Sequence, residues 1–79
     1  MKVKLKFYSG LEKYIRNYQN KEIIVTLNKN DSLKNIITRF LPSEMLNYIY
    51  LLVDNQIVNQ DYQVLDGDEI KIFLLLIGG

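Results

Sequence analysis

Apolar and polar residues alternate at the start of the chain. Val3, Leu5 and Phe7 are separated by a lysine at each intervening position. A period of two is typical of a β-strand that buries one face, so we expect a first strand whose other face is a solvated row of lysines. Residues 22–28 repeat the alternation. These two strands are expected to pair antiparallel, as a hairpin that carries a helical insert.

The insert is predicted at residues 11–18, after Ser9 and Gly10 end the first strand. Its apolar residues have the i, i+3, i+4, i+7 spacing that is typical of a short amphipathic helix. They are Leu11, Tyr14, Ile15 and Tyr18.

The clearest helical pattern covers residues 33–41, where apolar positions form a single stripe that would face a core. These positions are Leu33, Ile36, Ile37 and Phe40. Ser32 is a favourable N-cap, and Asp31 adds negative charge at the positive end of the helix dipole. Pro42 is expected to end the helix, because the residue before a proline avoids helical backbone angles.

Three further strands are expected in the second half of the chain, at residues 48–53, 57–58 and 70–75. A polar turn at residues 54–56 separates the first two. A second turn at residues 66–68 contains a glycine that can adopt a positive φ, and it precedes the last strand.

Together these elements predict an α+β fold, with a curled mixed sheet of about five strands packed on one main helix and a short helix between the first two strands. Alternate residues of a strand face opposite sides. Phe73 and Leu75 would therefore project from the sheet face that the main helix leaves uncovered. We expect one domain at residues 1–75, followed by a flexible tail at residues 76–79.

The composition is that of an ordinary globular domain, with 48% hydrophobic and 24% charged residues and a net charge of +1. So small a charge predicts no strong attraction to nucleic acid or to a membrane. The N-terminal residues lack the apolar run of a signal peptide. Small secreted domains usually contain disulfides, so the absence of cysteine favours a cytoplasmic location.

The chain also lacks histidine and tryptophan. Cysteine nucleophiles, histidine bases and Cys/His zinc sites are therefore excluded, and we expect no bound cofactor and no metal. Carboxylates crowd the turn at Asp66, Asp68 and Glu69. In a turn such groups usually accept bonds from their own backbone, so we do not expect a catalytic pair there.

The chain ends in Gly78 and Gly79, two of only four glycines. At average glycine usage a terminal pair is expected in about one chain in 200. Glycine weakens strands and helices, so the pair contributes nothing to packing. A carboxylate on a tail without side chains is suited to entering a narrow channel of another protein, although a terminal pair can also be a neutral end.

The element order and the terminal residues resemble the ubiquitin-like β-grasp sulfur carriers over the whole chain. These carriers include the small subunit of molybdopterin synthase and the thiamine-biosynthesis sulfur carrier. The resemblance rests on residues 3–8, Ser32-Leu33, residues 53–58, Asp61, residues 66–70 and residues 73–79. Its most specific element is the Asp-Gly-Asp-Glu-Ile turn, followed by the last strand and the final glycine.

The resemblance implies that this chain is a carrier and not itself an enzyme. An E1-like enzyme would use ATP to adenylate the Gly79 carboxylate, and sulfur from a sulfur donor protein would convert it to a thiocarboxylate. The large catalytic subunit of molybdopterin synthase would then transfer that sulfur to a pterin precursor. The residues expected to dock on these partners are Phe73, Leu75, Leu76, Ile77 and Gly78.

Two other interpretations remain open. The insert at residues 11–18 and the chain length favour the molybdopterin subunit, whereas the apolar residues 75–77 are closer to the thiamine type. A thiamine-type carrier or a ubiquitin-like modifier of lysines would use the same adenylated tail. A β-grasp interaction module with an inert tail is the third interpretation.

Overall fold

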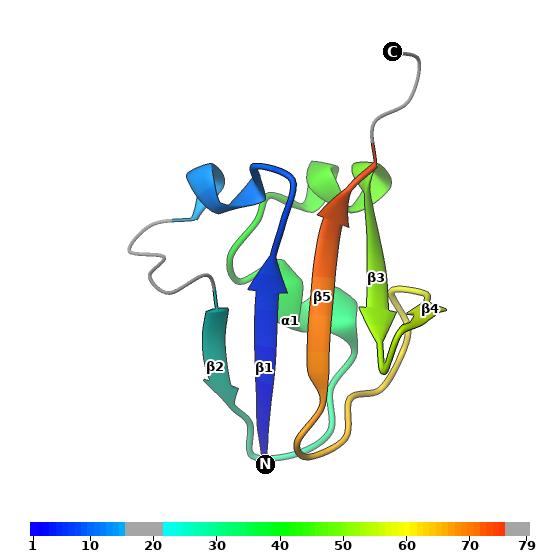
Figure 1. Ribbon diagram of the computed structural model, residues 1–79. Helices are drawn as coiled ribbons and strands as arrows, with labels where there is room; N and C mark the ends of the chain where they lie inside the picture. The colour runs from blue at the N-terminus through cyan, green and yellow to red at the C-terminus, as the bar shows by residue number, and fades with distance from the viewer. Residues whose placement is uncertain (16–21, 76–79) are drawn as a thin grey trace.

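The alternating N-terminal segment forms strand β1 (Lys2–Phe7) of a five-stranded mixed sheet. The structure is a computed structural model that describes residues 1–15 and 22–75 (Figure 1). The other strands are β2 (Glu22–Thr26), β3 (Ile49–Val53), β4 (Gln56–Val58) and β5 (Glu69–Leu74). The helices are α1 (Leu33–Ile37) and two 3₁₀ helices, η1 (Leu11–Tyr14) and η2 (Ser43–Tyr48).

The central strand of the sheet is β5, the last strand in the chain. The strand order is β2-β1-β5-β3-β4. Strand β5 is parallel to β1, with Ile70 opposite Leu5, and antiparallel to β3. Strands β1 and β2 pair antiparallel, which confirms the predicted hairpin. Figure 1 shows β1 and β5 side by side, with their C-terminal ends at the same edge of the sheet.

The core lies between one face of the sheet and α1, which crosses behind the sheet in the view of Figure 1. On α1, the side chains of Leu33, Ile36 and Ile37 have no exposed surface. The sheet contributes the alternate apolar residues of its two longest strands, Val3, Leu5, Phe7, Ile70 and Ile72. The predicted packing of one main helix on a five-stranded mixed sheet is confirmed.

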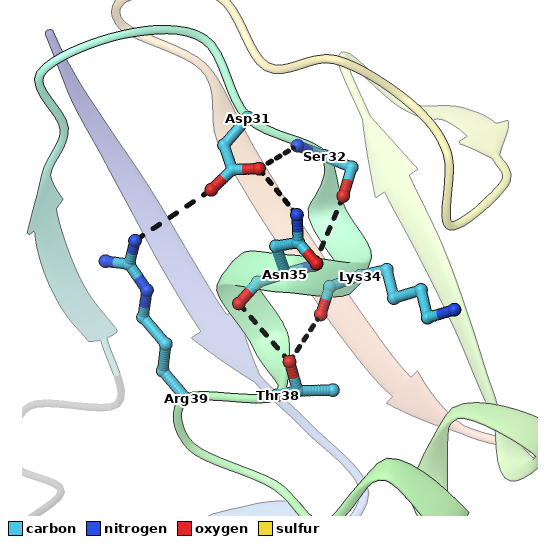
Figure 2. Close-up of polar contacts among 6 residues, drawn as sticks. All are labelled: Asp31, Ser32, Lys34, Asn35, Thr38 and Arg39. Carbon is cyan, nitrogen blue, oxygen red and sulfur yellow. Dashed lines mark hydrogen bonds and ion pairs between the residues drawn. The ribbon is translucent and has the colours of Figure 1, made fainter.

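The predicted N-cap of α1 is also confirmed (Figure 2). The Ser32 hydroxyl accepts a hydrogen bond from the Asn35 backbone N–H at 3.2 Å. The Asp31 carboxylate accepts from the Asn35 side-chain amide at 2.8 Å and from the Ser32 N–H at 2.9 Å, and it lies 3.9 Å from the Arg39 guanidinium. These two hydrogen bonds lower the pKa of Asp31 from its ordinary value, with a smaller effect from Arg39.

The main helix is shorter than predicted, because it ends at Ile37 instead of residue 41. The Thr38 hydroxyl donates to the Lys34 carbonyl at 2.8 Å and also contacts the Asn35 carbonyl at 3.3 Å. The Thr38 backbone N–H keeps its helical bond to the same Lys34 carbonyl, at 3.1 Å. The chain then continues in tighter turns, and Phe40 N–H bonds to the Ile37 carbonyl at 2.9 Å.

The insert between β1 and β2 differs from the prediction in two ways. Within the described residues it is the single 3₁₀ turn η1 rather than the start of a regular amphipathic helix, and residues 16–21 lie outside the description. Leu11 and Ile15 are buried as expected, but Tyr14 is exposed. The Lys13 ammonium lies 5.6 Å from the centre of the Tyr14 ring, an arrangement that solvent-exposed aromatic rings favour.

The turn between β3 and β4 is tighter than predicted, because Gln56 already belongs to β4. Asp54 and Asn55 both have positive φ, at 53° and 65°. Two consecutive positive φ values are the signature of the type I′ turn, whose twist matches that of the strands it joins. The second predicted turn is confirmed at Gly67, which has a φ of 88°.

The Asp31 cluster predicts how stability responds to acid. Because the pKa of Asp31 is lower in the folded protein than its ordinary value, its contribution is present above that value and disappears as the pH falls through the folded pKa. Asp31→Asn should therefore lose less free energy of unfolding than the wild type between about pH 5 and pH 2. Urea denaturation at a series of pH values measures this difference.

A matched control is Asp61→Asn, because the Asp61 side chain makes no hydrogen bond or ion pair with the residues that the structure describes. This variant should follow the wild-type pH profile. An Asp31→Asn profile identical to that of the wild type would contradict the stabilising role of the carboxylate.

Candidate functional site

The sheet face opposite α1, here called the outer face, is divided into an aromatic part and a charged part. Its residues alternate with those of the core along each strand. The aromatic part lies at the C-terminal end of β5, next to Leu75. The outer residues of the three central strands and their continuations are Lys4, Lys6, Tyr8, Glu69, Lys71, Phe73, Tyr50 and Leu52.

Three rings from three neighbouring strands stack on one another in the aromatic part. The Phe73 ring on β5 lies 4.7 Å from the Tyr8 ring, with an angle of 9° between their planes. On its other side it lies 5.0 Å from the Tyr50 ring, at 10°. Since β1 and β3 flank β5, the tyrosines cover both faces of Phe73. We call Tyr8, Phe73 and Tyr50 the aromatic stack.

The outer face continues beyond the aromatic stack for one more pair of residues. The Leu75 N–H donates to the Tyr48 carbonyl at 2.6 Å, so the pairing of β5 with β3 extends past Leu74. Both side chains are exposed, Leu75 by 42% and Tyr48 by 54%. Exposed apolar side chains that adjoin one another commonly mark an interaction site.

The charged part of the outer face is largely neutralised within the molecule. The Lys6 ammonium lies 3.1 Å from the Glu69 carboxylate, and Lys4 lies 3.8 Å from Glu22. The bond with Glu69 raises the pKa of Lys6, and the same bond lowers the pKa of Glu69. Both pairs are partly exposed, so each contributes little to stability. The predicted lysine face is a solvated strand face bearing cross-strand ion pairs.

Two of the residues predicted to dock on partners fall within the description. Phe73 lies at the centre of the aromatic stack, half-buried, and Leu75 is exposed beside it. Neither residue belongs to the buried core beneath the sheet. The other predicted site residues, Leu76, Ile77, Gly78 and Gly79, lie outside the described residues.

The sequence prediction did not single out three aromatic residues beside Phe73, namely Tyr8, Tyr48 and Tyr50. Tyr8 continues the alternation of the lysine face by one position, and this signal was present in the sequence. Tyr50 lies in a mostly apolar run. Periodicity in such a run shows neither which strands it pairs with nor which of its residues face outward. Its place beside Phe73 follows from the pairing of β3 with β5.

The carboxylates of the turn before β5 have structural roles. Asp68 accepts hydrogen bonds from the Leu65 backbone N–H at 2.9 Å and from the Tyr62 hydroxyl at 2.8 Å. The latter bond raises the pKa of Tyr62. Asp66 accepts from the Lys2 backbone N–H at 2.8 Å. The expected bond to the backbone of the same turn is made by Asp68, whereas Asp66 bonds to the backbone of β1 and Glu69 pairs with Lys6.

Within residues 1–15 and 22–75, no group of three or more acidic, histidine or cysteine side chains is arranged to hold a metal ion. No helix in this part of the chain is long and apolar enough to cross a membrane.

No family model matches the sequence, and no curated protein matches it closely enough to be informative. Solved structures match the fold. SAMP1 from Haloferax volcanii superimposes with a TM-score of 0.73 at 13% identity, and the match covers 100% of both chains. A candidate molybdopterin converting factor subunit 1 from Pyrococcus furiosus has a TM-score of 0.73 at 16% identity, covering 96% of this chain and 99% of its own.

A third structure is the complex of subunits 1 and 2 of the molybdopterin-converting factor from Helicobacter pylori 26695. One of its chains matches with a TM-score of 0.62 at 19% identity, over 100% of both chains. These similarities confirm the predicted ubiquitin-like β-grasp fold. At such low identity they describe the fold alone, so the activity of this chain has to be argued from its own residues.

The half-buried position of Phe73 predicts an intermediate cost for its removal. Phe73→Ala should lower the free energy of unfolding by about 1–2 kcal/mol, because ring stacking and part of the apolar burial are lost. Phe7→Ala is the matched control, since Phe7 is only 2% exposed, and removing a core phenylalanine costs about 3–5 kcal/mol. Urea denaturation measures both. Equal losses would assign Phe73 to the core rather than to a surface.

Proposed function

We propose that this protein is a sulfur carrier whose Gly79 carboxylate is the reacting group. An E1-like enzyme joins the carboxylate to AMP with release of pyrophosphate from ATP. A sulfide equivalent from a sulfur donor protein then displaces AMP and leaves a thiocarboxylate. In the form of the proposal that we favour, the chain is the small subunit of a molybdopterin synthase, and its sulfur passes to a pterin precursor held by the large subunit.

The observation that carries this proposal is the continuity between the aromatic part of the outer face and the residues that follow β5. Leu75 is anchored to the sheet through Tyr48, and the aromatic stack lies beside it. A fully extended run of residues 76–79 spans about 14 Å. Any enzyme that acts on Gly79 must therefore approach this end of the sheet closely.

The proposed docking residues divide into two groups. Phe73 and Leu75 contact the partner's surface as part of the sheet, because half-buried aromatic side chains are frequent anchors of protein interfaces. Leu76, Ile77 and Gly78 enter the channel that leads to the partner's active site. The absence of a Cβ at Gly78 lets the partner's backbone approach closely there.

The chain supplies no catalytic group in this proposal. It has no histidine or cysteine, and the carboxylates of the turn before β5 are engaged in hydrogen bonds to the backbone and to Tyr62. Catalysis belongs to the partners, which bind ATP and the pterin precursor. Their proposed setting is the cytoplasm.

A second function uses the same activated tail. The Haloferax volcanii protein with this fold is named a small archaeal modifier protein. In a modifier, the amine of a substrate lysine attacks the acyl carbon of the adenylated Gly79 and forms an amide bond. Thiamine-type sulfur transfer shares the first steps of the carrier reaction and differs only in the final acceptor.

Intact-mass spectrometry tests the proposed reaction. Incubation with an E1-like enzyme, ATP and a sulfur donor protein should replace one oxygen atom of the chain by sulfur. Omission of ATP is the control and should leave the mass unchanged. An unchanged mass with every cognate activating enzyme would rule out the carrier function. A lysine adduct without sulfur would favour the modifier function.

Deletion of Gly79 should abolish sulfur incorporation and leave the urea-unfolding midpoint unchanged, because glycine has no side chain to bury and the last residues of a domain rarely contribute to its core. Circular dichroism and denaturation check the fold of the shortened chain. Loss of folding in this variant would mean that the terminal residue is structural instead of reactive.

A further inference from the structure

Lys71 lies at the boundary between the charged and the aromatic parts of the outer face. On one side it is opposite Lys6 of β1, and Glu69 precedes it by two positions on the same face of β5. Along β5 it comes two positions before Phe73, about 7 Å away on the same face. Across the sheet it is opposite Leu52 of β3, which in turn is opposite Ile57 of β4. Ile57 is 74% exposed, the largest value among the exposed hydrophobic residues described. A surface that covers both Phe73 and Ile57 therefore also covers Lys71.

Within the described residues Lys71 forms no ion pair of its own. The pKa of Glu69 is lowered chiefly by Lys6 and to a smaller extent by Lys4 and Lys71. Lys6 and Lys4 pair with Glu69 and Glu22. A charge that loses its water in an interface without gaining a partner weakens binding strongly. A docking surface that covers Lys71 must therefore contribute a compensating group.

A shallow recess of about 220 Å³ beside Lys71 provides space for such a group. It is lined by Leu52, Asp54, Asn55, Glu69 and Lys71. The Asp54 carboxylate also has no ion pair within the described residues. However, it lies in the turn that ends β3, further from the aromatic stack than Lys71 is. Glu69, the other carboxylate of the recess, is already paired with Lys6. Among the unpaired charges that line the recess, Lys71 is therefore the one next to Phe73 along β5.

The aromatic stack leaves no face of the Phe73 ring open to a ligand. Both faces of the Phe73 ring are covered by Tyr8 and Tyr50, so a nucleobase cannot stack on them as it does in single-strand binding proteins. The rings can instead offer their edges, which carry partial positive charge. Ring edges and an unpaired ammonium are both complementary to carbonyl and carboxylate oxygens.

We infer that the enzyme that adenylates Gly79 presents a carboxylate to Lys71, within an apolar surface that covers the aromatic stack and Ile57. The inference rests on the proposed function for the identity of the partner. The ion pair fixes which way the carrier lies on the enzyme and favours this carrier over relatives that lack a cation at this position.

Titration of the purified E1-like enzyme without ATP tests the inference apart from any chemistry. Lys71→Gln should weaken binding about tenfold. Lys71→Glu should weaken it more, because the new carboxylate would face the carboxylate of the enzyme. Lys34→Gln on α1 removes the same charge from the other side of the molecule and should bind like the wild type. Asp54→Asn should bind as tightly as the wild type or more tightly.

Carbodiimide cross-linking gives a second readout, because it joins an amine directly to a carboxylate within contact distance. Peptide mapping of the cross-linked complex should connect Lys71 to an aspartate or glutamate of the enzyme. Circular dichroism of each variant verifies its fold, which should be retained because Lys71 has no ion pair within the described residues.

Four outcomes would overturn the inference. The first two are wild-type affinity for the enzyme in both Lys71 variants, and weakened binding in Asp54→Asn alone. The third is a wild-type chain that does not bind the enzyme. The fourth is a Lys71 substitution that changes only the binding of the chain to anionic vesicles or its self-association. Failure of the proposed function has a different signature. Lys71-dependent binding without sulfur incorporation would leave this contact intact and exclude the carrier chemistry.

Discussion

The parallel register of β1 and β5 determines which side chains meet on both faces of the sheet. It is held by backbone hydrogen bonds of 2.9 Å from Lys4 N–H to the Asp68 carbonyl and from Tyr8 N–H to the Ile72 carbonyl. On the inner side this register places Leu5 opposite Ile70 in the core. On the outer side it brings Tyr8 against Phe73. A slip of one residue would reverse the faces of a strand, so core and aromatic stack depend on the same pairing.

Strand β5 is fixed at both ends, which gives the following residues a defined starting point. At its beginning, Asp66 and Asp68 tie the preceding turn to β1 and to Tyr62. At its end, the bond between Leu75 and the Tyr48 carbonyl continues the sheet. Leu75 is therefore held in place relative to the outer face.

Features decided by neighbouring residues could be predicted from the sequence. Alternation identified β1, β2 and β5, an apolar run followed by a polar turn identified β3 and β4, and Ser32 identified the start of α1. The helix end was missed because the backbone changes to three-residue bonds at Arg39 and Phe40, and apolar spacing does not distinguish such turns from a regular helix. The outward position of Phe73 and Leu75 was predicted from the alternation of inward and outward residues along β5. Tyr50 joins them only through pairing between strands distant in sequence, which no local pattern specifies.

The central position of β5 has a consequence for the making of the protein. During synthesis, β1–β2 and β3–β4 emerge first as two separate hairpins, because the strand that joins them is the last to be made. Isolated hairpins are only marginally stable, and their open edges invite aggregation and proteolysis. A chain interrupted before residue 69 therefore lacks the strand that joins the two hairpins, and it cannot complete the sheet.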